Sequence, residues 1–221
     1  MEGKGLQQMF ITKFKFVPPP LIRLLYAEVA WESSCGKVLL TIDDSPSEDT
    51  TRVLDLLDQH QIKSVFFVNV PKTEKNKNVV KEIVKRGHLV ANHGMTHKKL
   101  RSLSPVVLHE QIVTSKQMLE DITGTAIKYF RPPYGAFDLN SYDAIIESGQ
   151  RPVMWTLLTG DYLGDLRLST SIIKKYLGKK SIVVMHDNPK SKEVFEGILQ
   201  VLVQTVDKKG YSFGGADECL K

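Results

Sequence analysis

The sequence has no hydrophobic stretch long enough to cross a membrane. The segment nearest to one, residues 21–31 (LIRLLYAEVAW), contains Arg23 and Glu28, and it falls short of the roughly 18 consecutive apolar residues that a transmembrane helix needs. Residues 1–16 also lack the apolar core of a secretory signal peptide. We therefore expect no membrane span in this chain, which is either intracellular or a mature form whose targeting segment has been removed.

Cysteine is scarce, with only Cys35 and Cys219 in 221 residues. Two cysteines so far apart are usually free thiols in a cytosolic protein. A disulfide is the alternative, because one precedes the first expected core strand and the other lies two residues from the C-terminus. If both ends of the chain meet at one end of a barrel, the bond would hold the barrel shut. It would stabilise the fold by about 4–5 kcal/mol on the chain-entropy model and would imply an oxidising compartment.

Segments that interleave aromatic residues with arginines, as in single-strand nucleic-acid binders, are also lacking. The net charge of +5 comes from lysines scattered over residues 71–86, 97–101, 172–180 and 206–210, a pattern typical of solvated helix faces and loops. We expect no nucleic-acid partner. There is no internal repeat or low-complexity tract, and 221 residues suffice for one sizeable core.

What the sequence does have is a regular alternation of strand-like and helix-like segments. Apolar runs typical of strands occur at residues 37–43, 64–70, 88–93, 128–134, 152–159 and 181–187, with a weaker run at 211–217. Apolar residues recur at helical spacing within 53–57, 80–84, 107–119 and 198–202. This alternation predicts parallel strands joined by crossover helices. We predict an α/β fold, a distorted (β/α) barrel of about seven parallel strands with outer helices, over residues 35–221, after an N-terminal extension of residues 1–34.

Polar residues gather at the carboxyl ends of these expected strands. They are Asp43 and Asp44 after the first strand, His93 and His97 after the third, Arg131 after the fourth, Asp161 after the fifth and His186 at the sixth. Active sites of α/β barrels lie at this mouth. The sequence therefore predicts that these residues converge in space.

Three of these residues form a potential metal site. Asp44, His93 and His97 are a two-histidine, one-carboxylate set that suits zinc or a similar divalent ion, with positions left open for water and substrate. The spacing of HGMTH (93–97) lets both imidazoles point the same way if His97 sits in a first helical turn. Asp43 would point to the opposite face of a regular strand, but a break at the strand end would bring it beside the metal site as a general base. Alone, the Asp pair would suit a turn or helix cap.

Together, five motifs resemble those of the polysaccharide deacetylases, carbohydrate esterase family four. TIDDSP (41–46) is similar to the family's TFDDGP, HGMTH to H-[ST]-x-x-H, RPPYG (131–135) to R-x-P-[FY], TGDY (159–162) to D-x-x-D-W, and VVMHD (183–187) to L-x-H. The motifs keep the family's order over residues 36–190. Members have a distorted (β/α) barrel and remove N-acetyl groups from chitin, peptidoglycan or related glycans, and some remove O-acetyl groups from xylan.

The resemblance implies a role for each motif residue. Asp44, His93 and His97 would hold one divalent metal, zinc or else cobalt. Asp43 would be the base that deprotonates the attacking water, and Arg131 would pair with it.

The other motifs would supply the remaining groups of the reaction. The backbone N–H of Tyr134 would stabilise the tetrahedral oxyanion. Asp161 would orient His186 and raise its pKa, so that His186 can protonate the departing amine. Pro132, Tyr134 and Tyr162 would line the substrate site. We expect His60, His88 and His109 to be structural, and Trp155 to be packing rather than a sugar platform.

Several positions depart from the family pattern. Ile42 and Ser45 replace Phe and Gly conservatively, whereas Gly94 replaces the Ser or Thr whose hydroxyl braces the metal loop. Leu158 replaces the first Asp of D-x-x-D-W, and Tyr162 replaces its Trp. We predict a metal-dependent N-deacetylase of a chitin-like N-acetylglucosamine polymer. The alternatives are a catalytically impaired deacetylase fold that binds metal and wall glycan, or one that acts on an unusual acetylated substrate.

A different metallohydrolase on the same barrel is a further alternative. It would show a phosphate-binding loop or a second metal cluster, and the sequence contains neither pattern. The substrate class predicts a secreted or cell-wall location and a polysaccharide partner. We also expect a monomer.

Overall fold

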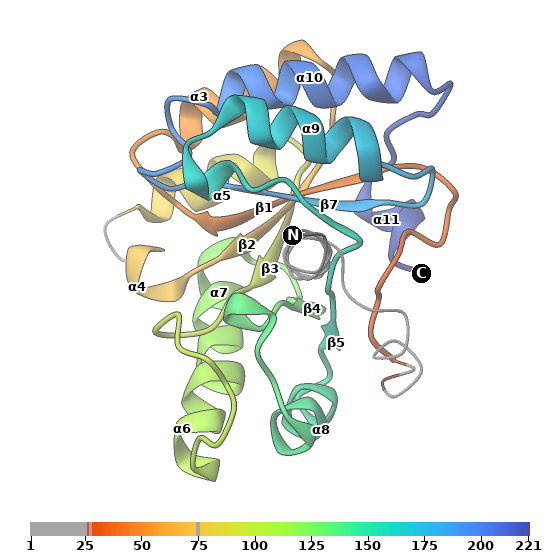
Figure 1. The fold of residues 1–221 in the computed structure, drawn as a ribbon. Coiled ribbons are helices and arrows are strands. Elements are labelled where there is room, and N and C mark those ends of the chain that lie inside the picture. The colour runs from red at the N-terminus through yellow and green to blue at the C-terminus, as the bar shows by residue number, and fades with distance from the viewer. Residues whose placement is uncertain (1–25, 27, 74–75) are drawn as a thin grey trace.

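Seven parallel strands form one curled sheet in the computed structural model, which describes residues 26, 28–73 and 76–221 (Figure 1). The strands are β1 (Leu39–Ser45), β2 (Val65–Val68), β3 (Leu89–Asn92), β4 (Tyr129–Phe130), β5 (Arg151–Pro152), β6 (Leu157–Leu158) and β7 (Ile182–His186). Their order across the sheet is β5-β4-β3-β2-β1-β7-β6. The two edge strands do not pair with each other in the described part of the chain, so the barrel is open on one side. The predicted fold class is confirmed.

The sheet is covered on both faces, which explains why its central strands are apolar almost throughout. Phe66 of β2 packs in the layer between the sheet and the outer helices, together with Leu54 and Ile198. Its neighbour Phe67 faces the barrel interior, together with Leu39. Adjacent residues on a strand point to opposite faces, so a run of apolar residues fills two core layers at once.

Helices and single turns connect the strands. They are α3 (Thr50–Gln59), α4 (Val70–Thr73), α5 (Lys77–Lys85), α6 (Pro105–His109), the π-helical turn η1 (Glu110–Thr114), α7 (Ser115–Thr123), the 3-10 turns η2 (Pro133–Gly135) and η3 (Asp161–Leu163), α8 (Leu139–Glu147), α9 (Leu166–Tyr176), α10 (Phe195–Lys208) and α11 (Ala216–Cys219). In Figure 1, α3, α9 and α10 lie over β1 and β7, while α6, α7 and α8 lie beside the short strands. The four segments with helical spacing are confirmed as α3, α5, α6 to α7, and α10.

Two strand predictions are wrong in detail. The run at 152–159 is not one strand, because β5 and β6 lie at opposite edges of the open sheet and residues 153–156 cross between them. The weak run at 211–217 is not a strand either. It contributes one bridge, between Phe213 and Val38, before the chain enters α11. The predicted count of seven strands is right. It holds because the predicted strand at 152–159 forms two strands, β5 and β6, while the run at 211–217 forms none.

The described part of the N-terminal extension packs on the barrel. Ala30 pairs with Val153 beside β5, and Trp31 lies in a small apolar cluster with Val29 and Met154. Most of residues 1–34 lie outside the described residues, and the boundary at 34 stays a prediction. None of the helices in the described ranges is long and apolar enough to cross a membrane.

Candidate active site

The structure brings the predicted residues together at the carboxyl ends of the strands. A cavity of about 620 Å³ opens there. It is lined by the predicted residues Asp43, Asp44, His93, His97, Pro132, Tyr134, Tyr162 and His186, and also by Trp155, Leu158, Asn188, Pro189 and Lys190. Arg131 and Asp161 lie fully buried behind it. The convergence expected from the strand ends is therefore present in the fold.

A backbone irregularity turns both carboxylates of β1 toward the cavity. Asp43 pairs in register with Phe67 and His186, but the pairing of β1 with β2 shifts between Asp43 and Ser45. At the shift, Asp44 has a left-handed φ of 69°, a conformation that few non-glycine residues adopt. Such a bulge breaks the alternation of side chains. The sequence analysis predicted that Asp43 could lie beside the metal site only if the strand broke at its end. This bulge is that break.

The three candidate ligands present their donor atoms to a common point. Nε2 of His97 lies 3.0 Å and Nε2 of His93 lies 3.9 Å from Oδ1 of Asp44, and the three donor atoms lie within 4.8 Å of one another. His93 bonds through Nδ1 to the backbone oxygen of Arg131 at 2.7 Å. Since a carbonyl oxygen only accepts, Nδ1 carries the proton and the Nε2 lone pair faces the site. Two imidazole nitrogens and one carboxylate oxygen fit zinc.

Electrostatics keep Asp44 and His93 in the state that binds a metal. Burial raises the pKa of Asp44, but the hydrogen bond from His97 and the nearby His93 and His186 outweigh it, and this pKa lies well below its ordinary value. Burial lowers the pKa of His93. A carboxylate and a neutral imidazole are the forms that coordinate metals.

His97 does not lie where the sequence analysis expected it, in the first turn of a helix. It is in the loop after β3, with a φ of 51°, and the next helix begins at Pro105. A left-handed residue in a loop, rather than helical periodicity, brings its imidazole next to that of His93, with ring centres 5.1 Å apart.

Arg131 forms a buried ion pair with Asp43. Its Nη1 lies 2.6 Å from Oδ1 of Asp43 and also donates to Oγ1 of Thr41 at 2.7 Å. Nε and Nη2 donate to the backbone oxygens of Val153 and Met154. The guanidinium lies 3.9 Å from the centre of the Phe67 ring. This set of contacts fixes the direction of the guanidinium and, through it, of Asp43.

His186 is held by Asp161 on the other side of the cavity. Its Nδ1 lies 2.9 Å from Oδ1 of Asp161, and its backbone N–H donates to Oδ2 at 2.6 Å. Burial alone would lower the pKa of His186, but the Asp161 carboxylate raises it to about 9. The edge of the Tyr162 ring lies against the imidazole, with centres 5.3 Å apart. His186 is thus a partly exposed cation at neutral pH, with Nε2 as the ring nitrogen that is not bonded to Asp161.

The RPPYG segment forms one wall of the cavity. Tyr134 has a φ of 60° and is 64% exposed, and its ring centre lies 4.7 Å from that of His97. Gly135 follows with a φ of 62°, and a Cβ there would lie 2.5 Å from the Trp155 ring. Trp155 therefore packs under this turn, as predicted from the sequence. It also lines the cavity, which the sequence analysis did not expect.

Residues 31–153 match the polysaccharide deacetylase family. The chain belongs to this family. It is 33% identical over 177 residues to a peptidoglycan-N-acetylglucosamine deacetylase of Bacillus cereus, a match that covers 78% of this chain and 62% of that relative.

Solved structures agree with the family match. The Bc1960 peptidoglycan N-acetylglucosamine deacetylase, crystallised with an N-hydroxybenzamide compound, superposes with a TM-score of 0.82 at 27% identity, covering 89% of this chain and 94% of that one. The chitin deacetylase of Colletotrichum lindemuthianum gives a TM-score of 0.77 at 28% identity, covering 84% and 88%.

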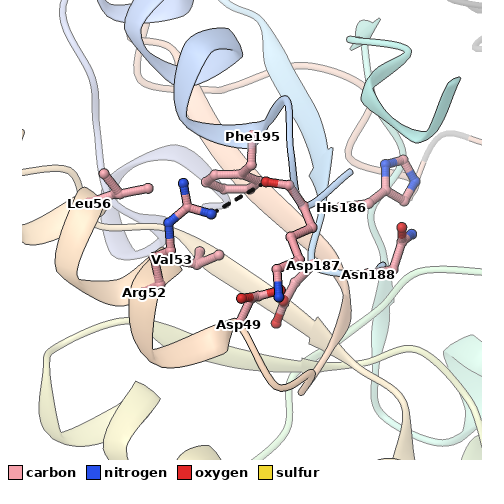
Figure 2. A pocket seen from close by; sticks show the side chains of 9 residues that line it. Asp49, Arg52, Val53, Leu56, His186, Asp187, Asn188 and Phe195 are labelled. Carbon is pink, nitrogen blue, oxygen red and sulfur yellow. Dashed lines mark hydrogen bonds and ion pairs between the residues drawn. The ribbon is translucent and has the colours of Figure 1, made fainter. Parts of the chain in front are cut away.

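The candidate site includes a residue that the sequence did not indicate. Asn188 donates from Nδ2 to Oδ2 of Asp44 at 2.8 Å, while its Oδ1 accepts from the backbone N–H of Lys190 at 3.0 Å. Figure 2 shows His186 and Asn188 together on one side of Asp187, whose own carboxylate points toward the start of α3. The only signal in the sequence is its place two residues after His186. Otherwise Asn188 looks like an ordinary loop asparagine.

The remaining histidines lie outside the lining of this cavity. Buried His88 accepts a hydrogen bond at Nδ1 from the backbone of Ser64 and packs edge-on against Phe66. Burial lowers the pKa of His88 to about 4. It is a neutral core histidine, as expected.

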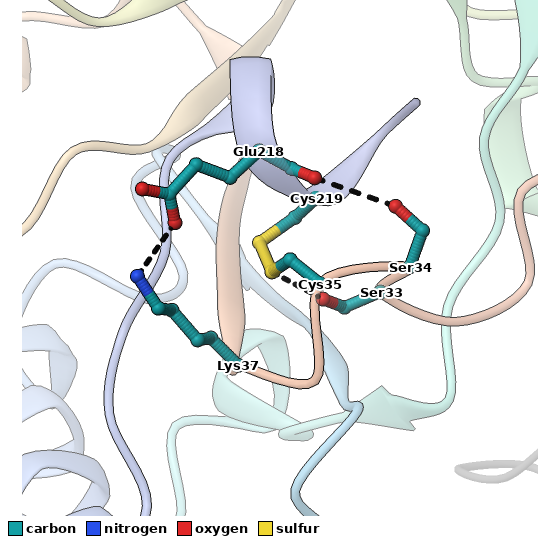
Figure 3. Close-up of a disulfide and its surroundings, with 6 residues drawn as sticks. All are labelled: Ser33, Ser34, Cys35, Lys37, Glu218 and Cys219. Carbon is teal, nitrogen blue, oxygen red and sulfur yellow. Dashed lines mark hydrogen bonds and ion pairs between the residues drawn. A yellow bond between two sulfur atoms is a disulfide. The ribbon is translucent and has the colours of Figure 1, made fainter.

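Cys35 and Cys219 form a disulfide with Cα atoms 4.7 Å apart (Figure 3). An ion pair between Lys37 and Glu218, 2.7 Å long, lies beside it. The bond joins the segment before β1 to α11, near the C-terminus. The sequence left two alternatives open for these cysteines, and the structure has the disulfide rather than two free thiols.

Proposed function

We propose that this protein is a metal-dependent polysaccharide N-deacetylase that acts on a chitin-like N-acetylglucosamine polymer. One observation carries the proposal: the Asp43–Arg131 pair and the Asp161–His186 pair reach the same cavity as the donor atoms of Asp44, His93 and His97. This arrangement supplies a proton acceptor, a proton donor and a metal-binding set at one place.

Asp44, His93 and His97 would hold the ion, zinc or alternatively cobalt. When bound, the ion acts as a Lewis acid that polarises the acetyl carbonyl and promotes deprotonation of water.

Asp43 accepts the proton of the attacking water. Its position beside Arg131, with Nη1 and Oδ1 2.6 Å apart, holds one carboxylate oxygen and leaves the group aimed from β1 into the cavity. A base held in one orientation contributes by both proton transfer and positioning. The backbone N–H of Tyr134 donates to the oxyanion that forms as the new C–O bond is made.

His186 donates the proton that the leaving amine requires. With a pKa of about 9 it is protonated at neutral pH, and Nδ1 is occupied by Asp161. Nε2 is therefore the atom that transfers a proton to the sugar nitrogen as the C–N bond breaks. The products are acetate and a free amine. Pro132, Tyr134 and Tyr162 would contact the sugar.

The rival is a deacetylase fold that binds glycan or metal with little turnover. It rests on the altered fourth motif, where Leu158 and Tyr162 line the cavity. The intact pairs around Asp43 and His186 favour the enzyme. A two-metal hydrolase is disfavoured, since the described residues hold one other such cluster, Cys35–Glu218–Cys219, whose cysteines are joined in a disulfide.

A secreted or cell-wall location and a monomeric state belong to the same proposal. The substrate class and the Cys35–Cys219 disulfide support an oxidising, extracytoplasmic compartment.

Acetate release tests the proposal directly. The Zn²⁺-loaded protein is incubated with chitin oligomers, peptidoglycan and acetylxylan, with Asp43→Asn as the inactive control. We expect release from N-acetylated glycans by the wild-type protein alone. Tight Zn²⁺ binding without acetate release from any of the three would instead support the glycan-binding rival.

A further inference from the structure

The loop after β3 carries two of the three candidate metal ligands but lacks a hydroxyl side chain at position 94. Gly94, with a φ of 83°, stands where the family has Ser or Thr. Its N–H donates to Oδ1 of Asn92 at 2.9 Å. Glycine at a left-handed position is unstrained but imposes little rigidity, so the loop between His93 and His97 needs support from elsewhere in the fold.

Gln111 supplies that support. It is 1% exposed, and its Oε1 accepts from the backbone N–H groups of Met95 at 3.1 Å and Thr96 at 2.9 Å. A Cβ at Gly94 would lie 3.4 Å from the same oxygen. One side-chain oxygen thus satisfies two successive amides of the five-residue ligand loop. A glycine lets the loop lie this close to it.

Gln111 is aimed at the loop by the π-helical turn η1. A π-helical turn inserts one extra residue into a helix, and such turns are frequent at functional sites. The carbonyl oxygen of Gln111 accepts from Oγ of Ser115 at 2.6 Å, and that of Ile112 accepts from Nδ2 of Asn92 at 3.1 Å. Asn92 therefore bonds through Oδ1 to the ligand loop and through Nδ2 to η1. The turn and the loop are tied to the same residue at the end of β3.

We propose that Gln111 is a positioning residue for the metal site, replacing the missing hydroxyl at position 94. This inference rests on the proposed function, since it concerns the ion that His93 and His97 would bind. Gln111 touches neither imidazole and acts through the backbone of residues 95 and 96. The left-handed φ of His97 persists only where surrounding contacts determine it, and the two hydrogen bonds to Gln111 lie immediately before it.

Two measurements on Gln111→Met test the proposal, because methionine keeps the length of the side chain and removes the acceptor. In the metal-free protein, amide hydrogen exchange at Met95 and Thr96 is expected to rise about tenfold or more, since each loses its bond. Zn²⁺ affinity, measured by competition with a chelating dye, is expected to fall about 10- to 100-fold. Gln111→Glu retains the acceptor and is expected to keep both values near wild type.

Gln117→Met is the matched control, because Gln117 is exposed on α7 and its Nε2 donates to Oδ1 of Asp121, away from the ligand loop. It should leave exchange and Zn²⁺ affinity unchanged. If Gln111→Met does not fold, Gln111→Asn, whose oxygen is one methylene short of the loop, is expected to show the same two changes.

Zn²⁺ affinity within about twofold of wild type in a folded Gln111→Met or Gln111→Asn protein would overturn the role of Gln111 alone. An equal loss in Gln111→Glu would also overturn it. A wild-type protein that binds no Zn²⁺ would overturn the proposed function itself, so the two failures are distinguishable.

Discussion

The guanidinium of Arg131 and the carboxylate of Asp43 form an ion pair that is almost completely removed from solvent, with Nη1 and Oδ1 2.6 Å apart. The two residues come from β1 and from the segment after β4, 88 positions apart in the chain. A buried charge that loses its partner is strongly destabilising. The pair therefore links the candidate base to the stability of the fold.

Removing one partner of this pair is expected to cost more than removing both. Arg131→Met should lower the free energy of unfolding by about 3–5 kcal/mol, because it leaves Asp43 buried without its cation. The double variant Asp43→Asn, Arg131→Met should recover part of that loss. Urea unfolding of the wild-type protein, Arg131→Met, Asp43→Asn and the double variant measures the coupling. A loss of less than about 1 kcal/mol in Arg131→Met would mean that water replaces the cation.

The two histidines of the ligand loop are expected to be required for metal binding but not for folding. His93→Ala and His97→Ala should abolish tight Zn²⁺ binding, since each removes one of three donor atoms. Elemental analysis of the purified proteins gives the stoichiometry, and circular dichroism reports the fold. The control is His60→Ala, which changes an exposed histidine at the end of α3. Unchanged zinc content in either loop variant would contradict the assignment.

Asn188 is expected to fix the orientation of the Asp44 carboxylate. Nδ2 of Asn188 donates a hydrogen bond to Oδ2 of Asp44, which leaves Oδ1 to coordinate the ion. Asn188→Ser should weaken Zn²⁺ binding about tenfold, because the carboxylate is then free to rotate. Dye competition measures the affinity, with Lys192→Ala as the control, because Lys192 is exposed and lies outside the lining of the cavity. Equal affinities for Asn188→Ser and wild type would rule out this role.

Asp161→Asn is expected to lower the pKa of His186 from about 9, because burial is then opposed only by the charges of Asp43 and Asp44. NMR titration of the metal-free protein follows the imidazole. The raised pKa means that the ion pair stabilises the fold fully below pH 6.5 and that this contribution is lost as the pH rises through about 9. Activity that needs protonated His186 should decline over the same upper range. A His186 pKa unaffected by Asp161→Asn would contradict this account.

The Cys35–Cys219 disulfide is expected to contribute about 4–5 kcal/mol to the free energy of unfolding, since it closes a loop of nearly the whole domain. The double variant Cys35→Ser, Cys219→Ser should show this loss in urea, and reduction of the wild-type protein should reproduce it. Non-reducing mass spectrometry of protein purified without reductant should find no free thiol. Two free thiols would contradict the bond.

The strand ends were the part of the site that the sequence could predict. In a parallel barrel all carboxyl ends of the strands meet at one mouth, so Asp43, His93 and His186 could be placed together without knowledge of any contact. The division of residues 152–159 into β5 and β6 was not predictable, because it depends on where the curled sheet opens.

The roles of the supporting residues Gln111 and Asn188 could not be predicted from the sequence either. Gln111 looks like any polar residue on an amphipathic helix, and only the π-helical turn and the placement of α7 beside β3 aim it at the ligand loop. The role of Asn188 likewise depends on the distance between two segments that lie 144 positions apart. Local sequence patterns carry no information on such distances.

The bulge at Asp44 makes the candidate base and the candidate metal ligand consecutive residues that face the same space. Their separation is therefore governed by bond lengths and one peptide unit rather than by the docking of distant segments. Loosening of the outer helices would disturb His93, His97 or His186 long before it could pull the two carboxylates apart. If the candidate metal site opened partially at the loop after β3, Asp43 and Asp44 would on this basis stay together, and only the histidines of that loop would have to return.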